Sequence, residues 1–274
     1  MTLATETELL RARYGKVFEL DSPWNNCLTT LLSHRSIRAY LPNPLPPDTL
    51  ELLVTAAQSA STSSNLQTWS VVAVEDSRRK ERLSELAGGQ AHIRQCPLFL
   101  VWLADLARLT RIAESRGLVH EGLNYLEMFV MAVVDASLAA QNAVIAAESL
   151  GLGTVYIGAM RNHPEKVAAE LGLPNHVFAV FGLCVGYPDP DIAAAIKPRL
   201  SQEAVLHRET YSLEVQDPAI ARYNDVMATF YAQQQMNISG DWSQHSADRV
   251  ASANSLRNRA QLREMLKNLG FELR

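Results

Sequence analysis

The stretch EMFVMAVVDASLAAQNAVIAAESL, residues 127–150, is the most distinctive part of this 274-residue chain. As an α-helix it is apolar almost all round, and its narrow polar stripe consists of Asp135, Asn142 and Ser149, one every seven residues. A helix this apolar needs neighbours on nearly every side. The stretch therefore predicts a helix at the centre of the fold, covered by the chain's own core or by a second subunit.

The composition excludes several classes of protein. A net charge of −4 and a pI of about 6.0 give a nucleic-acid partner no electrostatic support. Residues 1–15 carry several charges and no apolar core, which argues against a signal peptide. The longest apolar stretch, residues 129–152, is interrupted by Asp135, Gln141, Asn142 and Glu148, which argues against a membrane span. The widely spaced Cys27, Cys96 and Cys184 indicate reduced cysteines of a cytoplasmic protein rather than a disulfide framework.

The rest of the chain predicts a mixture of helices and strands. Short apolar runs indicate strands, and capped segments with one apolar face indicate helices. The strands are expected at 69–74, 97–103, 154–157 and 177–185. The helices are expected at 48–60, where Asp48 can cap, at 77–86, between Asn162 and Gly172, at 218–235 and at about 247–269. Because helices and strands do not strictly alternate, an α+β layer fold is favoured over a doubly wound sheet.

Two short basic clusters lie far apart in the sequence: HRSIR at residues 34–38 and KPR at residues 197–199. Each combines cations with small donors beside a segment expected to be buried. A phosphate group is bound by this combination, because arginine offers a planar fork of donors and lysine a point charge. The clusters predict a phosphorylated ligand held where distant segments converge, although each alone is also typical of solvated surface charge.

Metal-dependent and triad chemistry find no support in the pattern. His92, His120 and His163 have no cysteine or carboxylate at ligand-like spacing, so no metal is predicted. No serine, histidine and acid form a local group either.

Several segments, taken in their order and spacing, resemble the FMN-dependent nitroreductase superfamily. The closer similarity is to its branch of oxygen-insensitive NADPH nitroreductases and luminous-bacterium flavin reductases. The resemblance runs continuously over residues 31–206 and weakens after that. The segments are HRSIRAY (34–40), STSSNLQ (61–67), GGQ (88–90), VVDASLAAQNAVIAAESLGLG (133–153), YIGAMRN (156–162), FGLCVGYP (181–188) and KPRL (197–200).

The resemblance implies a homodimer with an α+β fold: a central mixed β-sheet packed by helices, with two FMN sites at the subunit interface. Residues 31–206 would form the FMN-binding core. Residues 207–274 would be a helical C-terminal excursion of the same domain. Residues 1–30 form an N-terminal extension beyond the usual start of the family, and the resemblance gives them no function.

The resemblance also implies which residues bind FMN. His34, Ser36, Lys197 and Arg199 would take the phosphate, and Arg38 would lie near the pyrimidine edge, where reduction places negative charge. Gln90 would bond the same edge, and the backbone of Ile157 and Gly158 would face N5 and O4. Thr62, Ser63 and Ser64 would reach the flavin from the partner subunit. Arg35, Gln67 and Tyr156 complete the expected set.

The acceptor pocket would be lined by Glu127, Arg259 and Ser63. Each has a simpler interpretation as well. Glu127 heads an apolar helix, where the helix dipole favours an acid. Arg259 shares its segment with other arginines and is equally typical of a solvated surface. Residues 61–65 are also typical of a turn or helix cap.

The implied activity is that of an FMN-dependent NAD(P)H oxidoreductase. Two electrons pass from a reduced nicotinamide through FMN to a nitroaromatic, quinone or similar acceptor by a ping-pong mechanism. One alternative is a flavin reductase that supplies reduced FMN to a partner. An alternative of another class is a flavin-binding carrier or sensor without turnover. NADPH-specific relatives bind the 2′-phosphate with arginines where residues 233–241 here contain no Lys or Arg, so NADH is expected to serve comparably with NADPH.

Overall fold

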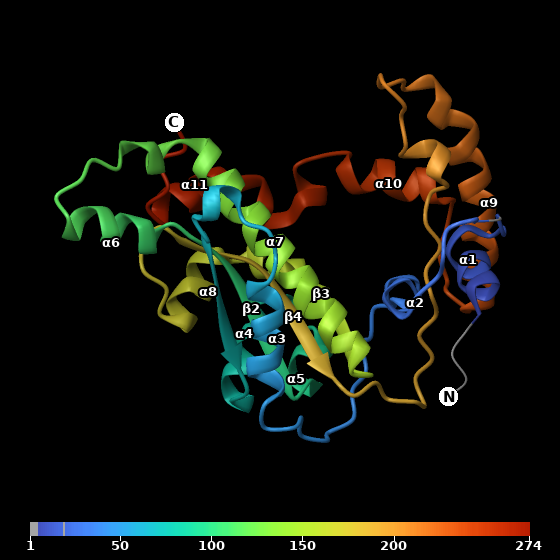
Figure 1. Ribbon diagram of the computed structural model, residues 1–274, viewed down its shortest axis with the longest axis horizontal. Helices are drawn as coiled ribbons and strands as arrows, with labels where there is room; N and C mark the ends of the chain where they lie inside the picture. The colour runs from blue at the N-terminus through green and yellow to red at the C-terminus, as the bar shows by residue number, and fades with distance from the viewer. Residues whose placement is uncertain (1–4, 19) are drawn as a thin grey trace. The chain divides into compact units, whose positions relative to one another are not determined.

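The computed structural model of the chain describes residues 5–18 and 20–274. The chain folds as two compact units (Figure 1). The helical unit contains residues 1–35 and 193–256, and the sheet unit contains residues 36–192 and 257–274. Each unit is therefore assembled from segments that are distant in the sequence.

The sheet unit is built on four strands in the order β1-β2-β4-β3. These are β1 (Trp69–Val74), β2 (Leu98–Asp105), β3 (Gly153–Ile157) and β4 (Val177–Gly186). Over residues 5–18 and 20–274 the three ladders are antiparallel, and parallel pairing is confined to an isolated bridge between Ser36 and Thr154. The expectation of a mixed sheet is wrong to this extent, because β2 and β3, which run in the same direction, are separated by the antiparallel β4.

Helix α7 (Leu126–Ser149) packs against α3 (Thr49–Gln58), and both helices share a core cluster with strands of the sheet (Figure 1). Its buried face consists mainly of alanines, whose small side chains let the helix lie close to the strands. Its opposite face exposes Leu126, Val130, Val134 and Leu138 at 44–50%. By length and composition alone α7 could cross a membrane, but its alanine face is packed as in a core helix.

Other helices complete the sheet unit. Helix α4 (Ser77–Leu86) packs against α5 (Ala91–Gln95) and α8 (Pro164–Leu171), α8 packs against β4, and α6 (Ala107–Ser115) follows β2. The C-terminal α11 (Leu262–Asn268) joins a second core cluster. There Phe271 packs edge-on to Phe129 of α7 at 5.2 Å, which ties the end of the chain to the central helix.

The helical unit contains α1 (Glu6–Tyr14), α2 (Asn26–Ser33), α9 (Asp217–Gln233) and α10 (Trp242–Val250). Helix α1 begins with a capping box in which Thr5 and Glu8 bond each other's backbone. It ends at Gly15, which has a left-handed φ of 71°. A side chain there would lie 3.0 Å from Val226 of α9, so this glycine allows α1 to end against α9.

The structure confirms the predicted strands to within two residues, as well as the helices α3, α4, α7, α8 and α9. A single helix over 247–269 is wrong. α10 ends at Val250, and a 3-10 segment with a left-handed Arg257 precedes α11. Ser252 and Ser255 bond each other's side chains and backbone there, which competes with a continuous helix. Asp48 precedes α3 but accepts no capping bond.

Candidate functional site

The segment that follows His34 and Arg35 is fixed on strand β3. The Ile37 amide donates to the Thr154 carbonyl at 2.9 Å. A side chain on Gly153 would lie 2.6 Å from Ile37, so only glycine permits this approach. The Tyr40 hydroxyl donates to the Ile37 carbonyl at 2.8 Å. Ile37 is buried, Ser36 is partly exposed and Arg38 is exposed, and the backbone of this segment is held on β3.

Arg38 and Gln90 lie near the same short helix. Gln90 is the residue before α5, and its side-chain amide donates to the Ala87 carbonyl at 2.9 Å. Burial lowers the pKa of His92 in α5, and the nearby charge of Arg38 lowers it further. His92 Nε2 is buried and has no hydrogen-bond partner in the described part of the chain. Gln90 thus directly precedes α5, and the charge of Arg38 acts on His92 within that helix.

The end of β3 presents backbone beside a guanidinium. Gly158 follows Ile157 directly, and a side chain on it would lie 3.3 Å from Nη2 of Arg161. Arg161 in turn donates to the Val180 carbonyl. Tyr156 is partly exposed, and burial and the charge of Glu148 raise its pKa, so its phenol stays protonated at neutral pH. This segment combines a glycine backbone with a nearby positive charge.

The loop of residues 62–68 is organised by Asp135, which is only 2% exposed. Its carboxylate accepts from Thr62 Oγ1 at 2.5 Å, from the Ser63 amide at 3.1 Å, and from both the amide and the hydroxyl of Thr68 at 3.1 Å. The loop backbone is unusual, with positive φ at Ser64, Asn65 and Gln67. Ser63, Ser64 and Gln67 remain exposed.

The sequence analysis did not assign Asp135 to the site and placed it only in the polar stripe of its helix. The one acid near the middle of an apolar helix was the signal that could have found it. A buried carboxylate needs partners, and a neighbouring loop rich in hydroxyls and free amides can provide them.

The expected acceptor-pocket residues take separate places. Glu127 is exposed on the first turn of α7, where the helix dipole favours it. Arg259 Nε donates to Asn162 Oδ1 at 2.9 Å. Burial lowers the pKa of the neighbouring Arg161, and the charge of Arg259 adds to this lowering. The structure therefore brings Arg259 to the segment that follows Gly158, together with a second guanidinium.

In the helical unit the two basic clusters meet at Arg13, which is 7% exposed. Arg13 Nη1 donates to the Lys197 carbonyl at 2.9 Å, and Nη2 donates to the carbonyls of Leu32 and His34 at 2.8 and 2.9 Å. Lys197 and Arg199 are exposed on either side of the buried Pro198. The sequence analysis missed Arg13, because nothing in its local pattern distinguishes it from a surface arginine.

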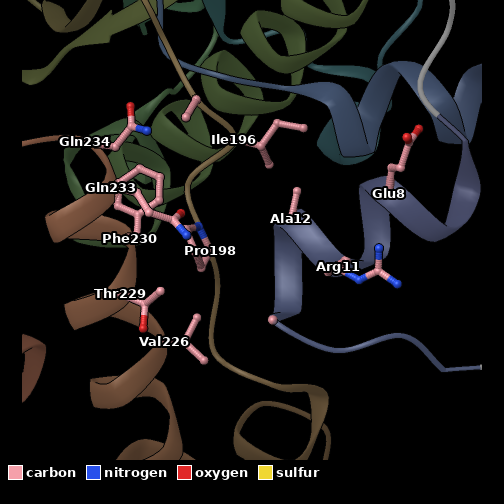
Figure 2. A pocket seen from close by; sticks show the side chains of 12 residues that line it. Glu8, Arg11, Ala12, Ile196, Pro198, Val226, Thr229, Phe230, Gln233 and Gln234 are labelled. Atoms are coloured by element: carbon pink, nitrogen blue, oxygen red, sulfur yellow. The ribbon is translucent and has the colours of Figure 1, made fainter.

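A cavity of about 580 Å³ lies in the helical unit. Figure 2 shows residues 196–198 running between α1 and α9, with Ala12 and Ile196 toward its apolar interior and Glu8 and Arg11 on the α1 side. Among the described residues, no group of three or more His, Cys, Asp or Glu side chains could hold a metal ion.

Two family models match this chain. The model of the nitroreductase family matches residues 31–187, more than half of the chain, and the model of that family's C-terminal domain matches residues 197–274. The chain belongs to the nitroreductase family. The resemblance seen in the sequence is thereby confirmed, and the protein is an oxidoreductase of the nitroreductase type.

Individual nitroreductases are similar over most of their length. The FMN reductase (NADPH) of Bacillus subtilis is 38% identical over 250 residues, which cover 90% of this chain and 98% of that protein. The oxygen-insensitive NADPH nitroreductase of Salmonella typhimurium is 40% identical over 218 residues, covering 78% and 87%. The solved structure of B. megaterium NfrA2 matches with a TM-score of 0.85 at 37% identity, covering 92% of this chain and 100% of that one.

Proposed function

We propose that this nitroreductase is an FMN-dependent NAD(P)H oxidoreductase that works by a ping-pong mechanism. A reduced nicotinamide would bind and leave oxidised, and a nitroaromatic, quinone or similar acceptor would then take its place. The observation that carries the proposal is the fixed presentation of Ser36 and Arg38 from β3, with Gln90 nearby. In a nitroreductase these are the side chains expected around the flavin.

The chemistry of the donors fits FMN. Its phosphate is a dianion, and the resemblance assigns it to His34, Lys197 and Arg199, whose backbone is bonded to the buried Arg13 within the helical unit. The polar edge of its ring needs a cation and donors, which Arg38 and Gln90 can supply. Bound FMN supplies the redox chemistry, because its ring accepts a hydride from the nicotinamide and returns it to the acceptor. The orphaned His92 Nε2 beside Arg38 is consistent with a polar group bound there.

The residues around the ring would act mainly by position and charge. Arg38 would hold a fixed cation where negative charge develops, and a hydrogen bond to a charged group contributes about 1.5–3 kcal/mol. Gly158 would let the backbone approach the ring closely. Arg161, packed against that glycine, would add positive potential on the same side. Glu127, Ser63 and Arg259 would line the space for the acceptor.

The decisive experiment is anaerobic addition of NADH or NADPH to the purified protein. We expect bound flavin at about one per chain, bleaching by the nicotinamide, and recovery of the colour on adding an acceptor. Arg38→Ala should weaken flavin retention or lower the reduction potential. A yellow protein that neither nicotinamide bleaches would indicate a carrier or sensor. A protein that takes up no FMN would overturn the proposal.

A flavin reductase is the second candidate, and the name of the Bacillus subtilis relative favours it. In that case free FMN would be the acceptor, and reduced FMN would be released to a partner. Steady-state rates with free FMN and with a nitroaromatic or quinone, at matched nicotinamide concentrations, separate the two functions. A kcat/KM that is higher for free FMN would favour the reductase.

We further propose a homodimer, in which residues 31–206 form the FMN-binding core and residues 207–274 belong to the same domain. The exposed apolar stripe of α7 supports a second subunit, because burying it would remove apolar surface from water. The exposed Ser63, Ser64 and Gln67 would then reach the partner's flavin. Sedimentation at micromolar concentration tests this: a monomer with full flavin occupancy would contradict it.

NADH should serve about as well as NADPH. Residues 233–241 contain no Lys or Arg, and Asp241 caps α10 by accepting from the Gln244 amide at 2.8 Å. Two nearby arginines are already engaged, Arg222 with Glu203 and Arg249 with the Ser255 carbonyl. The measurement is kcat/KM for both nicotinamides at low salt. A preference for NADPH above about a hundredfold, or about 2.8 kcal/mol, would show that other cations bind the 2′-phosphate.

A further inference from the structure

Helix α1 lies before the first residue that the nitroreductase family model matches, yet it is joined to a predicted cofactor segment. The link is Arg13 in its last turn. The guanidinium spans the carbonyls of Leu32, His34 and Lys197. The main chain adds a second connection, because the Arg199 amide donates to the Arg13 carbonyl at 2.8 Å. One residue therefore connects residues 32–34 with residues 197–199.

This arrangement fixes the direction in which the cations point. Pro198 is buried, and its carbonyl accepts from the Tyr223 hydroxyl at 2.9 Å. The Lys197 carbonyl is turned toward Arg13. With the backbone held on both sides, Lys197 and Arg199 are exposed, and the Arg199 guanidinium also donates to the carbonyls of Lys197 and Pro198 at 3.1 and 3.2 Å. Proline itself limits the backbone further, because its ring fixes φ.

The cavity shows how much of this connection depends on Arg13. Ala12, Gly15, Ile196 and Pro198 line it, so α1 and residues 195–198 are separated by open space along part of their length (Figure 2). Continuous side-chain packing therefore does not bind this stretch to α1. Hydrogen bonds from the side chain and the main chain of Arg13 hold the two together.

The charge of Arg13 has a second effect. A buried guanidinium solvated by carbonyls remains positive, and it lies within hydrogen-bond distance of the backbone of His34 and Lys197. The positive charge of Arg13 is thereby fixed beside the backbone of residues 34 and 197, and its potential attracts a dianion bound there. Arg13 therefore increases the attraction for a phosphate without needing to touch it.

We propose that Arg13 is a positioning residue for the phosphate of FMN. It acts by fixing the backbone that carries His34, Lys197 and Arg199 and by adding positive potential beside it. This inference rests on the proposed FMN-dependent function. It assigns a role to residues 5–18, which the family resemblance leaves without one.

The test compares two flavins that differ only in the phosphate. Full-length wild type, Arg13→Met and Arg13→Lys are freed of flavin, and the dissociation constants of FMN and riboflavin are measured by fluorescence. Arg13→Met should weaken FMN binding at least about tenfold, because charged hydrogen bonds and positive potential are lost. Arg13→Lys keeps the charge but loses the planar fork of donors, so its affinity for FMN should lie between those of the wild type and Arg13→Met. Riboflavin binding should change by less than about twofold.

Arg11→Met is the matched control, because Arg11 is exposed on the same helix and belongs to no predicted flavin contact. It should bind both flavins as the wild type does. Equal losses for FMN and riboflavin in the Arg13 variants would show a general structural defect and overturn the proposal, as would unchanged FMN binding. If Arg13→Met does not fold, Arg13→Lys decides, by the same comparison of the loss in FMN affinity with the loss in riboflavin affinity. Wild-type protein that binds neither flavin would instead overturn the FMN-dependent function.

Discussion

Two irregular segments, residues 62–68 in the sheet unit and residues 197–199 in the helical unit, are each held by one buried charged side chain. Asp135 accepts hydrogen bonds from amides and hydroxyls of the first segment. Arg13 donates to the Lys197 carbonyl of the second, and to carbonyls of residues 32 and 34. The signs are opposite because one segment turns its N–H groups inward and the other turns its carbonyls inward.

The two segments differ in how much they need that side chain. Residues 62–68 include three non-glycine residues with positive φ, a conformation that costs free energy and persists only when its surroundings enforce it. Residues 197–199 have a proline and a second anchor in Tyr223. A segment with a strained backbone should therefore depend more on its buried charge than a segment with a relaxed one.

The largest expected effect follows replacement of Asp135 by Ala. The amides of Ser63 and Thr68 would lose their acceptor, and each hydrogen bond to a charged group contributes about 1.5–3 kcal/mol. We expect the free energy of unfolding to fall by at least about 3 kcal/mol in urea titration. Amide hydrogen exchange should also accelerate at Ser63 and Thr68.

Asn142→Ala is the control for that experiment. Asn142 lies on the same helix, seven residues further on, and makes one neutral hydrogen bond to the Ala56 carbonyl at 3.1 Å. Its loss should cost only about 1 kcal/mol and should leave exchange at residues 62–68 unchanged. If the two variants lose equal stability, the buried charge is not what holds the loop.

A smaller effect is expected in residues 36–38, a segment that is held by packing and not by a buried charge. Ser36 and Arg38 are held by the fit of Ile37 against Gly153, where a Cβ would lie 2.6 Å from Ile37. Gly153→Val should cost about 1–3 kcal/mol of stability and should weaken flavin binding, because Ile37 must move. Gly122→Ala, a site with open space around it, should change stability by less than about 0.5 kcal/mol. An intact flavin affinity in Gly153→Val would show that the segment has another support.

The smallest effect is expected where charges are accessible to solvent. Glu170 accepts from Arg82 at 2.8 Å and from Arg79 at 3.3 Å, and the Arg82 hydrogen bond lowers the pKa of Glu170. Because this pKa is depressed in the folded protein, its contribution is present above the ordinary pKa of a glutamate and disappears as the pH falls through the folded value. Glu170→Gln should shift the urea midpoint of unfolding less than Asp135→Ala or Gly153→Val does, and only at neutral pH and low salt. An equal shift in acid would contradict this.

The sequence predicted the parts of the fold that depend on local pattern. The apolar runs of β2 and β4, the alanine-rich α7 and the Pro164 and Gly172 limits of α8 follow from propensity and capping. The break between α10 and α11 was not predicted, because it depends on hydrogen bonds between Ser252 and Ser255 that compete with helix. A long amphipathic pattern does not reveal such a competition.

The same distinction applies to the candidate site, where some residues could be named from the sequence and others could not. Arg38 and Gln90 could be named from motifs, and the structure places them near the same helix. Asp135 was marked only as the one acid in the middle of an apolar helix, and Arg13 could not be identified as a support at all, because its partners are backbone carbonyls far away in the sequence. A backbone carbonyl or amide carries no residue identity, so a side chain that binds it leaves no pattern to detect.

Helix α7 contributes one face to the core of the sheet unit and the other face to its surface. Its inner face is packed through alanines, and its outer face carries the exposed valines and leucines. A rigid helix cannot move one face without the other, so a larger residue at Ala139 or Ala143 would displace the whole outer stripe. The same displacement would shift Asp135 and the loop that it holds. The distance between α7 and the sheet therefore sets the positions of the outer apolar stripe and of the loop of residues 62–68 together.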